Sequence, residues 1–135
     1  MIHKVCPFII RQRDKQKEIL VFRHPIGNNI QFVKGTVEAG ENLEVAARRE
    51  LLEESGIEKL SKIEFKGSRK IGTEKQIWHF FYCHPADVLP ESWTFFANDD
   101  GGLNFSFFWF DIEESPSDEW HPTFQQALKF IKSKL

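Results

Sequence analysis

Hydrophobic and polar positions alternate along this chain in short blocks, a pattern typical of strands joined by polar turns. Six apolar runs predict strands, at residues 5–10, 19–22, 30–33, 63–72, 76–83 and 105–110. The charged segment 11–18 predicts a solvated hairpin loop between the first two of them. Apolar residues with helical spacing occur in 43–55 and 122–135. The pattern therefore predicts an α+β fold in which helices pack against a mixed central sheet.

The helix expected at 43–55 carries a signal at each end. Asn42 is suited to cap the N-terminus, and Glu44 lies near the positive end of the helix dipole. Gly56 stands where helices commonly end on a left-handed residue. Both ends of this helix can thus be predicted from local sequence.

Three glutamates of the same helix lie on one side. At about 100° per residue, Glu50, Glu53 and Glu54 fall within an arc of roughly 100°. Three apolar residues share that arc: Leu43, Ala46 and Ala47. The glutamates are therefore expected to lie on a half-buried face.

The other positions of the helix predict two further faces. Glu44, Arg48 and Ser55 form the side expected to face solvent. Val45 and Leu52 form a second apolar stripe, so the helix is expected to pack on two sides.

Three like charges on a half-buried face are unfavourable unless a cation lies among them. Each exposed like-charge pair costs about 0.2–0.5 kcal/mol, and desolvation adds to that cost. Carboxylate oxygens without a neighbouring His or Cys cluster favour Mg²⁺ or Mn²⁺ over zinc, and Arg49 can hold Glu53 from outside the ion. A divalent-metal site is one interpretation, and a salt-bridged surface helix is the other.

This part of the chain also resembles a known motif. The Nudix box has the pattern G-x5-E-x7-R-E-U-x-E-E-x-G-U, in which U is a bulky aliphatic residue. The chain fills every specified position with Gly35-x5-Glu41-x7-Arg49-Glu50-Leu51-Leu52-Glu53-Glu54-Ser55-Gly56-Ile57. Its length and order of strands also resemble those of the Nudix α/β/α sandwich.

The resemblance implies hydrolysis of a nucleoside diphosphate linked to another moiety, with Mg²⁺ or Mn²⁺ bound to the box helix. By the family pattern, Glu53 and Glu54 are metal ligands, and Glu50 is a ligand or the base that orients water. The backbone carbonyl of Lys34 is a further ligand. The remaining box residues have structural roles by the same pattern. Glu41 and Arg49 form a salt bridge, and Gly35 and Gly56 are the structural glycines.

Some positions leave alternatives open. Lys34-Gly35 resembles the Lys-Gly of dinucleoside polyphosphate hydrolases, so Lys34 can contact phosphate or be an exposed loop lysine. Many family members place a glutamate just before the last strand. Here Asp100 can substitute for it or belong to a simple turn. Arg23, at a strand end, can contact a phosphate or be an ordinary surface residue. The same two alternatives apply to Arg69 and Lys70.

Composition narrows the remaining choices. The chain has 18 Lys and Arg and 20 Asp and Glu, so its net charge is −2. This balance argues against a protein that binds nucleic acid or membranes through its overall charge, but it is compatible with a local basic site. Cys6 and Cys83 form neither a disulfide framework nor a zinc motif, and no segment has the length of a signal peptide or membrane span. We expect a cytoplasmic protein.

These inferences combine into one expectation. Residues 1–135 would form a single Nudix-like domain that hydrolyses a small-molecule nucleotide, with dinucleoside polyphosphates or nucleoside triphosphates as the favoured substrates. The alternative is a Nudix-fold module that binds or senses a nucleotide without hydrolysing it. The complete set of box carboxylates favours the enzyme.

Overall fold

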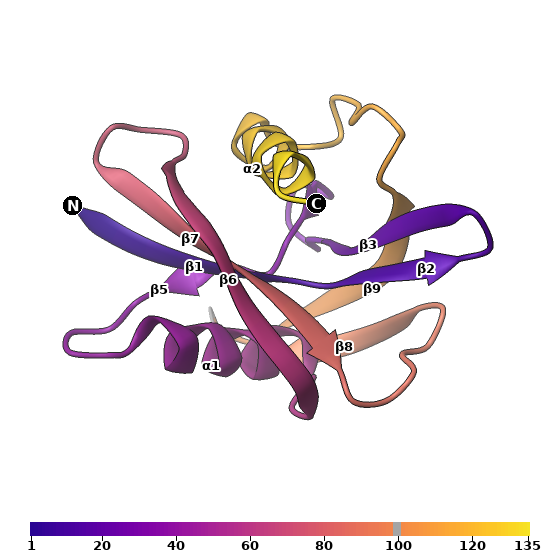
Figure 1. Cartoon of the computed structure of the whole chain (residues 1–135), viewed down its shortest axis with the longest axis horizontal. Helices are drawn as coiled ribbons and strands as arrows, with labels where there is room; N and C mark the ends of the chain where they lie inside the picture. Colours follow the sequence, from indigo (N-terminus) through magenta and orange to yellow (C-terminus); the bar gives the residue numbers. More distant parts are fainter. Residues whose placement is uncertain (99–100) are drawn as a thin grey trace.

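The computed structural model describes residues 1–98 and 101–135. Figure 1 shows a layer of strands with one helix on each side. The elements are β1 (Ile2–Phe8), β2 (Ile10–Arg13), β3 (Gln16–Arg23), β4 (Ile30–Gln31), β5 (Gly35–Thr36), α1 (Leu43–Ser55), β6 (Leu60–Lys70), β7 (Gln76–Pro85), β8 (Trp93–Ala97), β9 (Leu103–Asp111) and α2 (Pro122–Ser133). Neither helix is long and apolar enough to cross a membrane, within the described residues.

The strands form two sheets. The first has the order β5-β1-β7-β6, and its β1–β7 pair is parallel while the other pairs are antiparallel. The second has the order β2-β3-β9-β8 with β4 paired to β3, and it is antiparallel throughout. The α+β prediction is confirmed. The mixed sheet is the first of the two, where a parallel pair lies among antiparallel neighbours.

The charged segment 11–18 is not the loop that its composition predicts. β2 and β3 pair through it from Ile10↔Ile19 to Arg13↔Gln16, which leaves a turn of two residues. The Arg11 side chain contributes to this pairing, because its Nε donates to Glu18 at 2.8 Å and its guanidinium lies 4.3 Å from the centre of the Trp109 ring. Charged side chains are compatible with an edge strand that leaves them at the surface.

A hydrophobic core lies on each side of the strand layer, and β1 contributes to both. Val5 belongs to the core beneath α1, and Cys6 belongs to the core beneath α2, because successive strand residues point to opposite faces. The chain has 14 Phe and 4 Trp, and most of these rings lie in the two cores, as Trp78 and Trp120 do on the α2 side and Phe107 does on the α1 side.

Helix α1 begins and ends where its sequence signals predict. The Asn42 Oδ1 accepts hydrogen bonds from the backbone N–H groups of Glu44 at 2.9 Å and Val45 at 3.2 Å. Gly56 follows the helix with φ of 81°, and its N–H donates to the Leu52 carbonyl at 3.0 Å.

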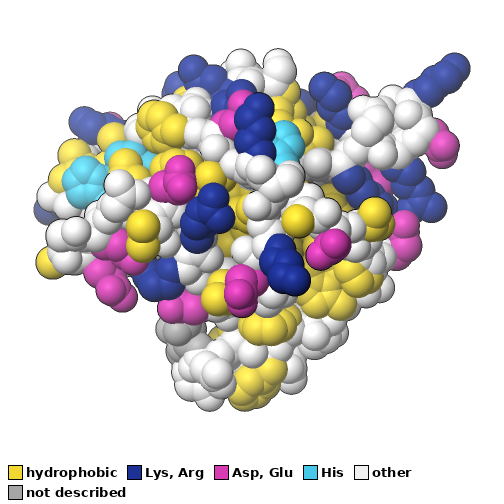
Figure 2. Space-filling view, turned by 60° about the horizontal axis from the view of Figure 1, so that its bottom comes forward, with side chains coloured by type: hydrophobic (Ala, Val, Ile, Leu, Met, Phe, Trp, Pro, Cys, Tyr) yellow, Lys and Arg dark blue, Asp and Glu magenta, His cyan; other side chains and the backbone are white. Residues whose placement is uncertain are grey.

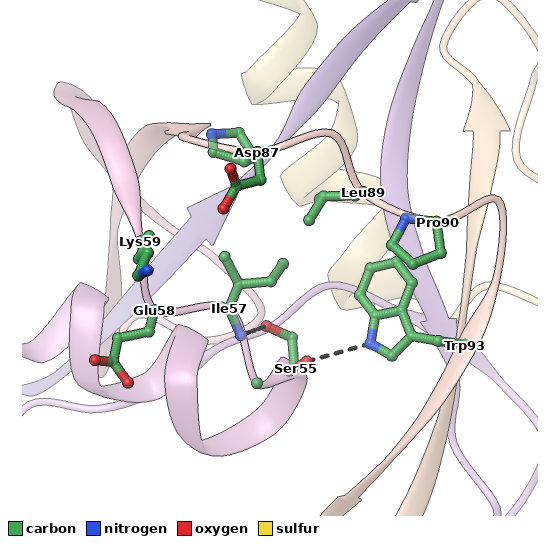
Figure 3. A pocket seen from close by; sticks show the side chains of 10 residues that line it. Ser55, Ile57, Glu58, Lys59, Asp87, Leu89, Pro90 and Trp93 are labelled. Carbon is green, nitrogen blue, oxygen red and sulfur yellow. Dashed lines mark hydrogen bonds between the residues drawn. The ribbon is translucent and has the colours of Figure 1, made fainter.

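Two predictions about the faces of α1 are wrong. Ser55, expected in solvent, is buried, because β8 covers the end of the helix and the Trp93 Nε1 donates to the Ser55 carbonyl at 3.2 Å (Figure 3). Val45 and Leu52, expected to form a second packing stripe, are 55% and 39% exposed. The helix packs on one side, since no element of the described chain covers its outer face.

The backbone at Gly56 suggests a test of the packing at the end of the helix. A Cβ at Gly56 would lie 2.6 Å from the Phe95 ring, whereas Gly40, with φ of 74°, has open space around its Cβ position. Gly40→Ala should therefore lower the free energy of unfolding by about 1 kcal/mol, because alanine disfavours the left-handed conformation. Gly56→Ala should lower it by at least about 2 kcal/mol, because the clash with Phe95 adds to the same penalty. Urea denaturation measures both values, and equal losses would contradict the predicted clash.

Candidate active site

A cavity of about 480 Å³ opens beside the middle of α1. We call it the acidic cavity. Its lining comes from α1, from β1 and from the segment that contains β5, and comprises Lys4, Lys34, Gly35, Thr36, Glu38, Arg49, Glu50, Glu53 and Glu54. The fold thus brings together the three glutamates and Lys34, as the sequence analysis predicts.

Glu50 is the buried member of this cavity. Only 6% of the residue is exposed, and its carboxylate lies directly against the backbone of Gly35. A Cβ on residue 35 would overlap the Glu50 carboxyl group, so the glycine at this position is required by close approach. The Arg49 Nη1 donates to the Glu50 Oε1 at 2.8 Å and balances its charge.

Arg49 joins the helix to the loop that precedes it. Its guanidinium binds Glu41 with two hydrogen bonds of 2.8 and 2.9 Å and donates to the Thr36 carbonyl at 3.1 Å. Because of these bonds, the Arg49 guanidinium lowers the pKa of Glu41 from 4.5 to about 2. The salt bridge that the resemblance implies for Glu41 and Arg49 is present.

Glu53 and Glu54 also line the cavity, and both are half-buried. The Arg49 Nη1 lies 3.3 Å from the Glu53 Oε2, so one guanidinium nitrogen contacts two of the three carboxylates. Within residues 1–98 and 101–135, no three His, Cys, Asp or Glu side chains gather closely enough to hold one ion. The cavity nevertheless supplies carboxylate oxygens, the donor type that Mg²⁺ and Mn²⁺ prefer.

Two lysines, Lys34 and Lys4, also line the cavity. The Lys34 ammonium lies 5.7 Å from the centre of the Trp78 ring and 5.8 Å from that of Phe124, and burial lowers its pKa, with Lys4 nearby adding to the effect. Lys4 donates to the Thr36 Oγ1 at 2.6 Å. Sequence reasoning missed Lys4, because only the pairing of β1 with β5 brings it here.

Other sequence candidates lie elsewhere. Arg23 does not line the acidic cavity, because it binds Glu119 at 2.7 Å and its guanidinium lies over Phe108. Asp100 lies outside the residues that the structure describes. Arg69 and Lys70 line a separate cavity on the other side of the first sheet.

The two helices enclose the layer of strands in an α/β/α arrangement, and the acidic cavity combines helix carboxylates with lysines. The family model for the NUDIX domain matches residues 3–129 of the chain. The chain therefore belongs to the Nudix family.

Two comparisons place the chain within this family. It is 33% identical to an NAD-capped RNA hydrolase NudC of Vibrio cholerae, over 93% of this chain and 44% of that protein. A second NudC, from Vibrio parahaemolyticus, is 32% identical over 93% of this chain and 46% of that protein. The chain thus spans less than half the length of the curated relatives it matches.

Solved structures agree with the fold. The NUDIX domain of Shewanella oneidensis NrtR, complexed with ADP ribose, has a TM-score of 0.69 at 12% identity, and the match covers 98% of this chain and 87% of that one. A C. elegans Ap4A hydrolase has a TM-score of 0.64 at 16% identity, with 98% and 96% covered.

The ion pair of Glu41 predicts a distinct response to acid. A carboxylate with a lowered pKa in the folded state stabilises the fold above its unfolded value of about 4.5, and the contribution is lost as pH falls toward about 2. The stability difference between the native protein and Glu41→Gln should therefore be constant above about pH 5.5 and shrink below it. Urea denaturation across this pH range measures that difference.

Arg49→Lys provides the control for this measurement, because lysine cannot form the two parallel bonds. In an Arg49→Lys background, Glu41→Gln should change the free energy of unfolding much less at every pH. If the difference in unfolding free energy between the native protein and Glu41→Gln were undiminished near pH 2, the Glu41–Arg49 ion pair would not be its cause.

Proposed function

We propose that the chain is a divalent-metal-dependent pyrophosphohydrolase that cleaves a nucleoside diphosphate linked to another moiety. The observation that carries this proposal is the position of Glu50. Its buried carboxylate faces a cavity that also contains two further carboxylates and two lysines. Phosphoanhydride cleavage requires both kinds of charge, one to hold a metal ion and one to bind phosphate oxygens.

The residues that would hold the ion are Glu53, Glu54 and Glu50, with the carbonyl of Lys34. When bound, Mg²⁺ or Mn²⁺ would neutralise phosphate charge and lower the pKa of a coordinated water. Because Arg49 contacts both Glu50 and Glu53, it can hold these two carboxylates of the cavity lining in place.

The chain's own side chains also provide for the substrate. The Lys34 ammonium is partly desolvated against two aromatic rings, so an anionic phosphate is a favourable partner for it. Lys4 approaches the same space from β1. Glu50, the buried carboxylate, would serve either as a ligand of the ion or as the general base that accepts a proton from an attacking water.

Dinucleoside polyphosphates or nucleoside triphosphates are the favoured substrates, on the Lys34-Gly35 pair. The NudC relatives support a second candidate, an NAD-type dinucleotide free or at the end of an RNA. The rival function is nucleotide binding without hydrolysis. A panel of these nucleotides, tested for phosphorylated products with and without Mg²⁺ or Mn²⁺, distinguishes the three, because a binding module would release none.

Glu53→Gln and Glu54→Gln test the metal assignment. Loss of a ligand should remove several kcal/mol of transition-state stabilisation, so kcat should fall by about a hundredfold or more. The fold should survive, and stability should stay constant or rise by a few tenths of a kcal/mol, because a like charge is removed. Steady-state kinetics at several Mg²⁺ concentrations, with thermal denaturation, measure both effects.

The matched control is Glu44→Gln, which removes a carboxylate from the exposed side of the same helix. It should leave kcat within about twofold of the native value. Unchanged turnover in both Glu53→Gln and Glu54→Gln would overturn the proposed metal site.

A further inference from the structure

Positive charge is concentrated on β6 and α2, in a chain whose net charge is −2. Together the two elements carry six lysines or arginines and a single acidic residue, Glu64. The six are Lys62, Lys66, Arg69, Lys70, Lys129 and Lys132. On the face around α1, by contrast, acidic and basic side chains are interspersed (Figure 2). The charge of β6 and α2 therefore favours an anionic ligand.

Part of this charge borders a groove. A cavity of about 310 Å³ lies between β6 and α2 and is lined by Arg69, Lys70, Gln126, Lys129, Phe130 and Ser133. We call it the basic groove. Its volume is at the lower end of the range of about 300–1,000 Å³ that is usual for small-molecule sites. Because Phe130 is buried, the part of the lining that a ligand can reach is polar and cationic.

Arg69 has no carboxylate partner among the residues that the structure describes. Each of the other five arginines of the chain binds a glutamate, at distances from 2.6 to 3.4 Å: Arg11, Arg13, Arg23, Arg48 and Arg49. A guanidinium group presents a planar fork of donors that fits two oxygens of one carboxylate or phosphate group. The fork of Arg69 is therefore available to an external anion.

Two side chains from α2 can donate to the same anion. Lys129 is exposed and forms no ion pair within residues 1–98 and 101–135. The Gln126 Oε1 accepts a hydrogen bond from the Gly72 N–H at 3.1 Å, which fixes the amide and leaves its NH₂ group to donate to a ligand. Lys70 differs from these residues, because it binds Glu74 at 3.1 Å. Donors from both walls of the groove are thus available to one ligand.

We propose that the basic groove is a second ligand site, which binds the polyphosphate chain of a small molecule. A polyphosphate is compact and hydrated and carries several charges, so one ligand can contact both Arg69 on β6 and Lys129 on α2. The protein's own cations balance these charges, so binding needs no metal ion. The basic groove shares no lining residue with the acidic cavity, so the proposal does not depend on the proposed hydrolase function.

A ligand that joins β6 to α2 should also stabilise the fold. Helix α2 packs on the first sheet through Phe130, whose ring lies 4.6 Å from that of Phe80, and through Phe124, whose ring lies 5.5 Å from that of Trp78. A polyphosphate in the basic groove adds polar contacts beside these apolar ones. Because a ligand that binds only the folded state stabilises it by mass action, Tm should rise with ligand concentration.

Isothermal titration calorimetry with inorganic tripolyphosphate in EDTA tests the basic groove. EDTA removes the divalent ions that the acidic cavity would need, whereas binding in the groove should persist and weaken with added salt. Arg69→Gln/Lys129→Gln should raise Kd at least about tenfold and reduce the rise in Tm, because both charge-assisted contacts are lost. Lys15→Gln/Lys17→Gln, which removes the same charge from the exposed β2–β3 hairpin, should keep Kd within about twofold.

The absence of tripolyphosphate binding, or binding that the groove variant leaves unchanged, would overturn the proposal. Equal weakening by Lys4→Gln would also overturn it, because it would place the ligand in the acidic cavity. Equal affinity for sulfate would show a general attraction of anions and no site for a polyphosphate. Tighter binding of hexaglutamate, or of an RNA oligonucleotide with a 5′ hydroxyl, would assign the groove to a macromolecule.

A nucleoside triphosphate, titrated under the same conditions, identifies the source of the polyphosphate chain. Binding equal to or weaker than that of tripolyphosphate would support an inorganic polyphosphate as the ligand. Tighter binding that the groove variant still weakens would support the phosphates of a nucleotide.

Activity tests whether the two sites are separate. In Arg69→Gln/Lys129→Gln, kcat/KM for nucleotides hydrolysed in the acidic cavity should stay within about twofold of the native value, since the sites share no lining residue. A tenfold fall would make the groove part of the substrate site and overturn its assignment as a second site. Groove-dependent binding of tripolyphosphate in a protein that hydrolyses no nucleotide would support the groove and overturn the hydrolase alone.

Discussion

The burial of the Glu50 carboxylate is the constraint on which the rest of the acidic cavity depends. A carboxylate removed from water must be balanced by a hydrogen-bonded cation, and Arg49 provides that cation at 2.8 Å. Arg49 is held in turn by Glu41 from the loop before the helix. Because Glu50 also lies against Gly35, a single ion-pair cluster fixes α1, its preceding loop and β5 relative to one another.

This arrangement places opposite charges around one small space. The glutamates extend from the rigid middle and end of a helix, and the lysines extend from β1 and from the segment before β5. Side chains held by regular elements keep their separation better than those on long loops, which is what a site for a phosphate chain and its counterion needs.

The sequence predicted what depends on neighbours in the chain and missed what depends on distant ones. The ends of α1 follow from Asn42 and Gly56, whose effects are local, and the cluster of glutamates follows from helical spacing. The burial of Ser55 depends on where β8 lies, and the exposure of Val45 follows because no element of the described residues covers the outer face of the helix. Helical spacing reveals neither. Lys4 reaches the cavity only through its pairing with Thr36, more than thirty residues away.

The parallel pairing of β1 with β7 has a consequence for how the chain folds as it is made. Ile2 pairs with Gln76, so this edge of β1 has no partner until 74 further residues have been synthesised, about 4–15 s at ordinary rates of translation. The β2–β3 hairpin, whose strands are joined by two residues, can form long before that. An emerging chain therefore exposes an unpaired edge of β1 for seconds, and such an edge can pair with a strand of another chain.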